Sequence, residues 1–207
     1  MIALIDYGAG NLTSVRKALS ALGAAYSTPA SPEACATASG IIVPGVGHFD
    51  ATRVLEGAWR DAIARAVGAG VPLLGICLGM QWLFEGSDEA PDVQGLGAIA
   101  GRVTRLKGNA PERLKIPHVG WNALVPPGGG RFTGRLLASL DPGAYVYFTH
   151  SYAAPVTDAC VAATTHAESF AAVVERGNVF GVQFHPEKSG DTGLAILRSY
   201  LEVARAC

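Results

Sequence analysis

The sequence is short of the features that mark several large classes of protein. Charged residues make up only 16% of its 207 residues, and the 16 lysines and arginines nearly balance the 17 aspartates and glutamates. Because nucleic-acid binders carry clustered positive charge, this balance argues against a nucleic acid as partner. No apolar run approaches the roughly 20 residues that span a bilayer, so we expect no membrane segment.

Cysteine is scarce as well, and its positions are far apart: Cys35, Cys77, Cys160 and Cys207. None of them forms a C-x-x-C pair, so the sequence predicts neither a disulfide framework nor a zinc site. We also expect no signal peptide, because Asp6 and the glycines after it interrupt the apolar N-terminus. Together these features predict a cytoplasmic chain without a metal ion or other cofactor.

The first half of the chain alternates short apolar runs with helical patterns. The sequence predicts strands at 2–5, 40–43 and 71–76, and helices at 12–22 and 51–67. This alternation is the βαβ signature of a buried parallel sheet, with helices packed on its faces.

After about residue 97 the pattern changes to closely spaced strands, which we expect to add antiparallel or mixed strands to the same sheet. The expected strands are 98–106, 121–125, 144–148, 160–165, 170–175 and 179–184. A last helix is expected at 192–204, because its leucines fall on one face. The prediction is a single α/β domain over 1–207, with a mixed, mostly parallel central sheet.

One cysteine stands in a context typical of a nucleophile. Gly75-Ile-Cys77-Leu-Gly79 follows the expected strand 71–76 and precedes a helix-like run at 78–84. A strand-to-helix turn holds a nucleophile on a strained backbone, and small residues on either side let the chain turn tightly. Helix amides would then face a thiolate and stabilise it. The alternative, a small buried residue with no chemistry, is less consistent with the glycine spacing.

A thiolate nucleophile needs a base, and the base needs an acceptor that orients it. His185 has an acid close by, because Pro186 favours an extended chain in which His185 and Glu187 project to the same side. In the alternative, both are ordinary loop residues after a strand. His48, next to a glycine loop, is another candidate base. The remaining histidines are interpreted as hydrogen-bonded structural residues: His118, His150 and His166.

Attack on an amide carbonyl produces an oxyanion, which backbone N–H groups must stabilise. The segment Gly45-Val46-Gly47 follows the expected strand 40–43 and could supply one such donor, and the amide of Leu78 could supply another. Alone this loop is a weak signal, because most glycine turns after strands are structural. A second glycine turn, at 7–11, lacks the spacing of a nucleotide-binding loop, so we expect no nucleotide there.

These residues resemble one family of enzymes. Gly75-Ile-Cys77-Leu-Gly-Met-Gln81, with His185-Pro-Glu187, resembles the class I (triad) glutamine amidotransferases. Within that class, segments spread over nearly the whole chain resemble the glutaminase subunits of imidazole glycerol phosphate synthases. These are Ile5-Asp-Tyr-Gly-Ala-Gly-Asn11-Leu, Pro44-Gly-Val-Gly-His-Phe49, Pro117-His-Val-Gly-Trp-Asn122, Tyr147-Phe-Thr-His-Ser-Tyr152 and Gln183-Phe-His-Pro-Glu-Lys-Ser189. The departures from the family pattern, such as Thr149 and Ser151, are minor.

The resemblance implies a flavodoxin-like, three-layer α/β domain that hydrolyses L-glutamine to glutamate and ammonia. In the implied mechanism, Cys77 attacks the side-chain amide, His185 moves protons and Glu187 orients His185. The oxyanion would be held by the Leu78 amide and the peptide within 45–47. The family pattern places glutamine against Gly47, Gln81, Glu89, Ser151 and Tyr152.

The resemblance also implies a partner, a separate cyclase chain with a (β/α)8 barrel that completes a heterodimer. The cyclase would use the ammonia to form imidazole glycerol phosphate and aminoimidazole carboxamide ribotide in histidine biosynthesis. The positions that match its contact surface are Asn11, Trp121, Tyr147 and Lys188. Because an unpartnered glutaminase would waste glutamine, we hypothesise that the segment 45–47 leaves the oxyanion hole unformed until the partner binds its ligand.

Other functions remain open at this point. A glutaminase that serves another synthase would differ only in the partner that restores its activity. A catalytically silent scaffold subunit would keep the fold, although retention of the three triad residues argues against it. A cysteine peptidase on a related fold would use a similar cysteine and histidine, but would not need Gln81, Ser151 and Tyr152.

Overall fold

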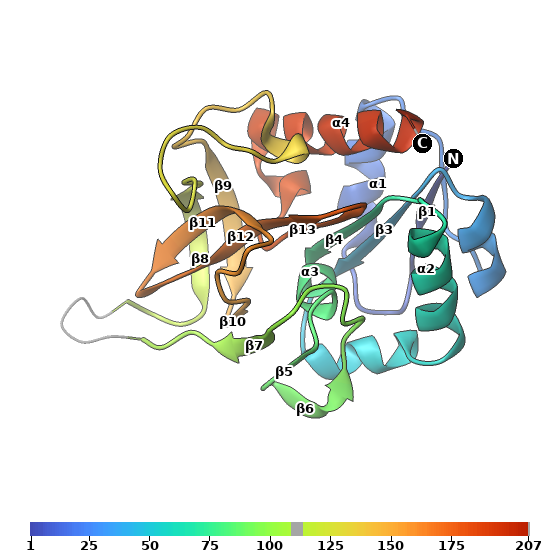
Figure 1. The fold of residues 1–207 in the computed structure, drawn as a ribbon, viewed down its shortest axis with the longest axis horizontal. Coiled ribbons are helices and arrows are strands. Elements are labelled where there is room, and N and C mark those ends of the chain that lie inside the picture. Colours follow the sequence, from blue (N-terminus) through green and yellow to red (C-terminus); the bar gives the residue numbers. More distant parts are fainter. Residues whose placement is uncertain (109–113, 207) are drawn as a thin grey trace.

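A sheet of seven strands forms the centre of the computed structural model, which describes residues 1–108 and 114–206 (Figure 1). In spatial order the strands are β11 (Cys160–His166), β12 (Glu168–Arg176), β13 (Val179–Val182), β4 (Leu73–Cys77), β3 (Gly40–Gly45), β1 (Ile2–Leu4) and β2 (Tyr26–Ser27). From β13 to β2 all neighbours are parallel, whereas β11 and β12 add to one edge in antiparallel pairs. The predicted mixed, mostly parallel sheet is confirmed.

Helices cover both faces of this sheet and complete three layers (Figure 1). One face packs against α1 (Leu12–Ala21) and α4 (Gly190–Ala206), and the other against α2 (Ala58–Gly68) and α3 (Leu78–Trp82). Side chains along β3 alternate between the two cores, as a sheet buried on both faces requires. None of the helices in the described residues is long and apolar enough to cross a membrane.

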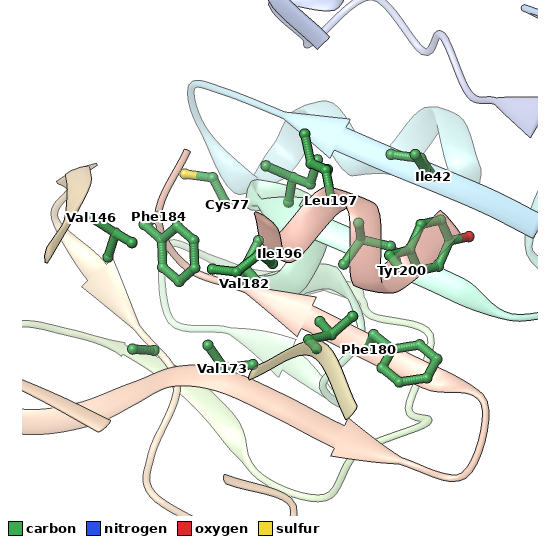
Figure 2. Close-up of a cluster of buried hydrophobic side chains, with 14 of the residues drawn as sticks. Ile42, Cys77, Val146, Val173, Phe180, Val182, Phe184, Ile196, Leu197 and Tyr200 are labelled. Atoms are coloured by element: carbon green, nitrogen blue, oxygen red, sulfur yellow. The ribbon is translucent and has the colours of Figure 1, made fainter. Parts of the chain in front are cut away.

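The core on the α4 side is continuous from the helix to the strands (Figure 2). Leu197 and Tyr200 of α4 pack on strand residues such as Ile42 and Phe180. The hydroxyl of Tyr200 also lies 2.8 Å from the Ile41 carbonyl oxygen and 3.0 Å from that of Pro72. The last helix is thus attached to the sheet by both apolar packing and hydrogen bonding.

Two smaller sheets lie beside the central one, so the prediction that every later strand joins the same sheet is wrong. One contains β10 (Tyr152–Ala153), β7 (Arg102–Arg105), β5 (Gly86–Ser87) and β6 (Ala90–Gln94), and the other pairs β8 (His118–Ala123) with β9 (Tyr145–His150). The physical reason is visible on β8, where Val119 and Trp121 are more than half exposed. A strand with one face open to solvent does not fit inside a sheet covered on both sides.

Glycines shorten two of the predicted elements. The helix expected at 51–67 is divided into a 3₁₀ helix, η2 (Phe49–Leu55), and α2, because Gly57 has a φ of 67°. The strand expected at 98–106 begins only after Gly101, whose φ is 113°. A residue with a positive φ interrupts both helical and extended backbone. The periodicity of apolar residues along the sequence does not reveal such a residue.

The turn from β4 into α3 requires two glycines. A Cβ atom on Gly79 would lie 1.8 Å from the carbonyl oxygen of Val43, and one on Gly75 would lie 2.5 Å from that of Gly79. These are backbone atoms of neighbouring elements and cannot rotate away. The predicted need for small residues on both sides of Cys77 is therefore confirmed, and the close approach fixes α3 against β3.

Three histidines meet where β8, β9 and β11 come together. The Nδ1 atom of His118 lies 3.2 Å from Nε2 of His150, and the ring of His118 stacks on that of His166 with centroids 4.1 Å apart. Burial, followed by repulsion from His166, lowers the pKa of His118 to about 4. Burial likewise lowers the pKa of His150 to about 3, with a smaller opposing effect from its bond to the Tyr152 carbonyl. Both rings are therefore held neutral.

We predict that Gly79→Ala destabilises the fold by at least about 2 kcal/mol, because the new methyl group meets backbone that cannot move aside. Gly68→Ala is the matched control, since a Cβ there meets no atom within 4 Å and alanine favours helix. The measurement is the urea midpoint of unfolding for both variants. Equal midpoints would show that the turn tolerates a side chain.

A second prediction concerns the stability of the fold at low pH. Between pH about 6.5 and 4, His118 and His150 are protonated in the unfolded chain but stay neutral in the folded chain. The free energy of unfolding therefore falls as the pH is lowered. The slope approaches about 1.4 kcal/mol per pH unit for each histidine. His118→Asn should reduce this slope by about one proton, whereas the exposed control His48→Asn should keep it. Unfolding in urea over this pH range tests both, and identical slopes would refute the prediction.

Candidate active site

Cys77 lies at the turn between β4 and α3, at the carboxyl end of the central strands. Its φ of 52° and ψ of −106° are unusual for a residue other than glycine, and such backbone costs about 1–3 kcal/mol. The side chain belongs to the edge of the α4-side core, where Figure 2 shows its sulfur at the end opposite Ile42 and Tyr200. The predicted strand-to-helix turn is thus present, with a strained cysteine at its apex.

His185 and Glu187 follow β13, which is the parallel neighbour of β4. The Nδ1 atom of His185 lies 2.8 Å from Oε1 of Glu187, and both side chains are only 2% exposed. Because a carboxylate oxygen accepts, Nδ1 is the nitrogen that donates. The other nitrogen, Nε2, is buried and makes no hydrogen bond to the described residues. The pair has the arrangement of an oriented acid–base group.

The charge on His185 is decided by competing effects. Burial alone would lower its pKa, because the charged ring loses its hydration. The interactions with Cys77 and Glu187 outweigh burial and raise the pKa to about 10. An imidazolium in this position is the neighbour that stabilises a thiolate nucleophile.

Hydrogen bonds from β9 hold the His185 segment in place. The backbone N–H of His185 donates to the Tyr147 carbonyl at 3.0 Å. The hydroxyl of Ser189 donates to the His185 carbonyl at 2.7 Å and accepts from the Tyr147 N–H at 2.9 Å. No role was predicted for Ser189, because no local pattern indicates that its hydroxyl would link two segments more than 40 residues apart.

A cavity of about 250 Å³ opens next to Cys77. Apart from Gly45, its lining contains the residues that were predicted to contact glutamine or the oxyanion, namely Val46, Gly47, Leu78, Gln81, Glu89, Ser151 and Tyr152. It also contains Pro117, Thr149 and His150, for which no binding role was predicted. Within residues 1–108 and 114–206, no group of three or more His, Cys, Asp or Glu side chains is arranged to hold a metal ion.

The glycine loop has one of its candidate donors engaged elsewhere. The N–H of Val46 donates to the Ala9 carbonyl at 2.9 Å, so it is not available to the pocket. Glu89, which lines the cavity, accepts from the N–H of Phe49 at 2.8 Å, two residues after the glycine loop. His48, the alternative base, is exposed and accepts from the N–H of Asp50 through Nδ1 at 3.1 Å, and it does not line the cavity.

A buried glutamine that the sequence analysis did not single out contacts the cysteine. Nε2 of Gln183 lies 3.7 Å from Sγ of Cys77, and its Oε1 lies 3.2 Å from Nε2 of Gln81. Gln183 precedes His185 by two positions at the end of β13, so an extended chain directs both side chains to the same side. That spacing was the available signal, but it gives no indication of contact with Cys77.

The four positions predicted to face a partner come from elements that pack together. Trp121 of β8 is 55% exposed, and its ring meets that of Tyr147 of β9 with centroids 6.1 Å apart. Lys188 is exposed on the short helix η4 (Pro186–Lys188), which packs against both β9 and α1. Asn11 caps α1, where its side chain accepts from the Ser14 N–H at 3.4 Å.

Similarity to known proteins extends over almost the whole chain. The glutamine amidotransferase class-I family matches residues 3–202. An imidazole glycerol phosphate synthase subunit HisH from Geobacillus thermodenitrificans is 47% identical, covering 98% of this chain and 96% of its own length. A protein of the same name from Deinococcus radiodurans is 45% identical, covering 96% of this chain and 92% of its own length.

Solved structures agree at the level of the fold. A crystal structure described as glutamine amidotransferase superimposes with a TM-score of 0.72 at 18% identity, covering 99% of this chain and 98% of that one. The structure of PurLQS from Thermotoga maritima gives a TM-score of 0.68 at 20% identity, covering 97% of each chain. With the sequence match, these results identify the chain as a member of the glutamine amidotransferase class-I family and, within it, of the imidazole glycerol phosphate synthase subunit HisH group.

Proposed function

We propose that this chain hydrolyses L-glutamine at Cys77 and passes the ammonia to a cyclase partner. The observation that carries the proposal is the cavity beside Cys77, with a buried His185–Glu187 pair at 2.8 Å on the next strand. A nucleophile, its base and an orienting acid next to a pocket are the parts required for acyl transfer. Family membership supports the same reaction class.

In the proposed reaction the Cys77 thiolate attacks the side-chain amide carbon of glutamine, and a carbon–sulfur bond forms. When the carbon–nitrogen bond breaks, the His185 imidazolium gives its Nε2 proton to the leaving nitrogen, which departs as ammonia. Water then attacks the thioester, His185 takes one of its protons, and the sulfur leaves with its electron pair. Glutamate is released and the ion pair is restored.

The polar groups of the cavity suit an amino acid substrate. The carboxylate of Glu89 can attract the α-ammonium group of glutamine, and Ser151 and Tyr152 add backbone and hydroxyl groups to the same cavity. The Nε2 atom of Gln81 donates to the Tyr152 carbonyl and to Oε1 of Gln183, so Gln81 offers the substrate its Oε1, which can accept from the α-ammonium group. The assignment of Gly47, Gln81, Glu89, Ser151 and Tyr152 to glutamine binding rests on their shared cavity and on the family pattern.

We further propose that the oxyanion hole forms only after the glycine loop rearranges. The Leu78 amide lies next to the nucleophile, but the Val46 N–H is bonded to Ala9 and must rotate before it can serve the oxyanion. Gly45 and Gly47 stand on either side of Val46, and because glycine adopts many backbone conformations, the free energy needed to rotate this peptide is small. An enzyme in this state would hold a charged nucleophile and still turn over slowly.

The partner surface that we propose is centred on the exposed face of β8 and β9. Trp121 at 55% exposure and Tyr145 at 59% leave apolar area uncovered, which is a usual sign of an interface. With Asn11, Tyr147 and Lys188, this face would contact a separate (β/α)8 cyclase chain in a heterodimer. The whole of 1–207 would act as one amidotransferase domain in the cytoplasm, within histidine biosynthesis.

Cys77→Ala should abolish glutamate release, lowering the rate by roughly three orders of magnitude or more, because no other group supplies the nucleophile. Cys160→Ala is the matched control and should retain activity, since the thiol of Cys160 bonds to the Ala162 carbonyl, away from the cavity. The assay measures glutamate released from glutamine in the presence of the cyclase partner. Activity in a folded Cys77→Ala protein would dismiss the proposed triad.

Partner coupling gives a separate test. Glutamate release should be slow for the purified chain and should rise at least about a hundred-fold when a histidine-pathway cyclase barrel and its ribonucleotide ligand are added, because the oxyanion donors then become available. A chain that is fast alone would refute the coupling. If only a different synthase restores activity, the pathway assignment is wrong, and activity toward peptides would favour a cysteine peptidase instead. A chain silent with every synthase would favour the scaffold alternative.

A further inference from the structure

A line of buried amides runs from the wall of the cavity to the nucleophile. Nε2 of Gln81 lies 2.9 Å from the Tyr152 carbonyl oxygen and 3.2 Å from Oε1 of Gln183, whose Nε2 lies 3.7 Å from Sγ of Cys77. Gln81 is 3% exposed and Gln183 is fully buried, so water does not compete for these groups. The three side chains come from α3, the end of β13 and the end of β4.

The direction of this line is set at its far end. The Tyr152 carbonyl oxygen can only accept, so Gln81 must turn its N–H₂ end toward it. The same nitrogen faces Gln183, which must therefore present its carbonyl oxygen there. The N–H₂ end of Gln183 is left to face the sulfur of Cys77. A backbone carbonyl thus decides which end of a buried amide meets the nucleophile.

We propose that Gln183 is a catalytic residue that donates a hydrogen bond to the Cys77 thiolate. An amide N–H stabilises negative charge but does not give up its proton, so it favours the thiolate without converting it to a thiol. The imidazolium of His185 stabilises the same charge, but it loses its proton to the departing nitrogen during turnover. A neutral donor keeps its hydrogen throughout, and it can support the sulfur again when the thioester breaks and the electron pair returns to it.

The catalytic consequence rests on the proposed function, but the effect on the sulfur does not. Thiolate stabilisation can be measured without glutamine, through the pH dependence of Cys77 alkylation by iodoacetamide. A residue with only a packing role would alter stability and leave this pH profile where it is. The two ideas can therefore fail separately.

The experiment follows alkylation of Cys77 by mass spectrometry of its peptide, in the intact chain, from pH about 4 to 10. Gln183→Met removes the donor at similar length, and Gln183→Glu replaces the N–H₂ with a carboxylate oxygen that repels the thiolate. Since a hydrogen bond to a charged group changes an equilibrium about ten-fold or more, the midpoint should rise by about one pH unit in Gln183→Met and further in Gln183→Glu. Gln94→Met, at an exposed position of β6, is the matched control and should keep the wild-type midpoint.

Each outcome decides the proposal. A raised midpoint in every Gln183 variant that folds, with the control unchanged, supports it, and circular dichroism shows which variants are folded. If Gln183→Met does not fold, the isosteric Gln183→Glu carries the test alone. A wild-type midpoint in a folded variant overturns the proposal, whatever the glutaminase assay gives. A raised midpoint in a chain that releases no glutamate would overturn the proposed function and leave this inference standing.

Discussion

The parallel pairing of β3, β4 and β13 is the constraint on which the candidate site depends. The register sets Gly45 opposite Cys77 and Val182 opposite Ile76, so the three carboxyl ends stop at the same edge of the sheet. The glycine loop, the cysteine and the His-Pro-Glu segment each follow one of these strands. The pairing of β13 with β4 brings into contact residues more than 100 positions apart in sequence, such as Cys77 and Gln183.

That register is possible only because glycines, which have no side chain, stand where neighbouring elements approach each other closely. Gly79 approaches the Val43 carbonyl so closely that no Cβ fits between them, and this contact seats α3 against β3. The strained backbone of Cys77 is enclosed by the same packing. The strain therefore persists because β3, β4 and α3 determine the turn from three sides, and relaxing it would require them to separate.

Part of this arrangement could be predicted from the order of apolar residues and glycines along the sequence. Apolar runs located six of the seven strands of the central sheet, all except the two-residue strand β2, and the glycine spacing located the turn at Cys77. The same signals could not separate the main sheet from the small ones, since β8 differs only in having one exposed face. They also could not identify Gln183, because its importance comes from contacts with Cys77 and Gln81 across the fold.

The two halves of the site are in different states, and the difference has a physical basis. The parts that we propose to stabilise charge on sulfur are buried and bonded at the sheet edge, where His185 meets Glu187 and Gln183 meets Cys77. The parts that would stabilise charge on oxygen lie in a loop, and the Val46 N–H is bonded to Ala9. Breaking one backbone hydrogen bond at the surface costs about 1 kcal/mol, far less than disturbing a buried ion pair. We therefore expect a partner that docks near α1 and β9 to rearrange the Val46 hydrogen bond more easily than the buried groups around Cys77.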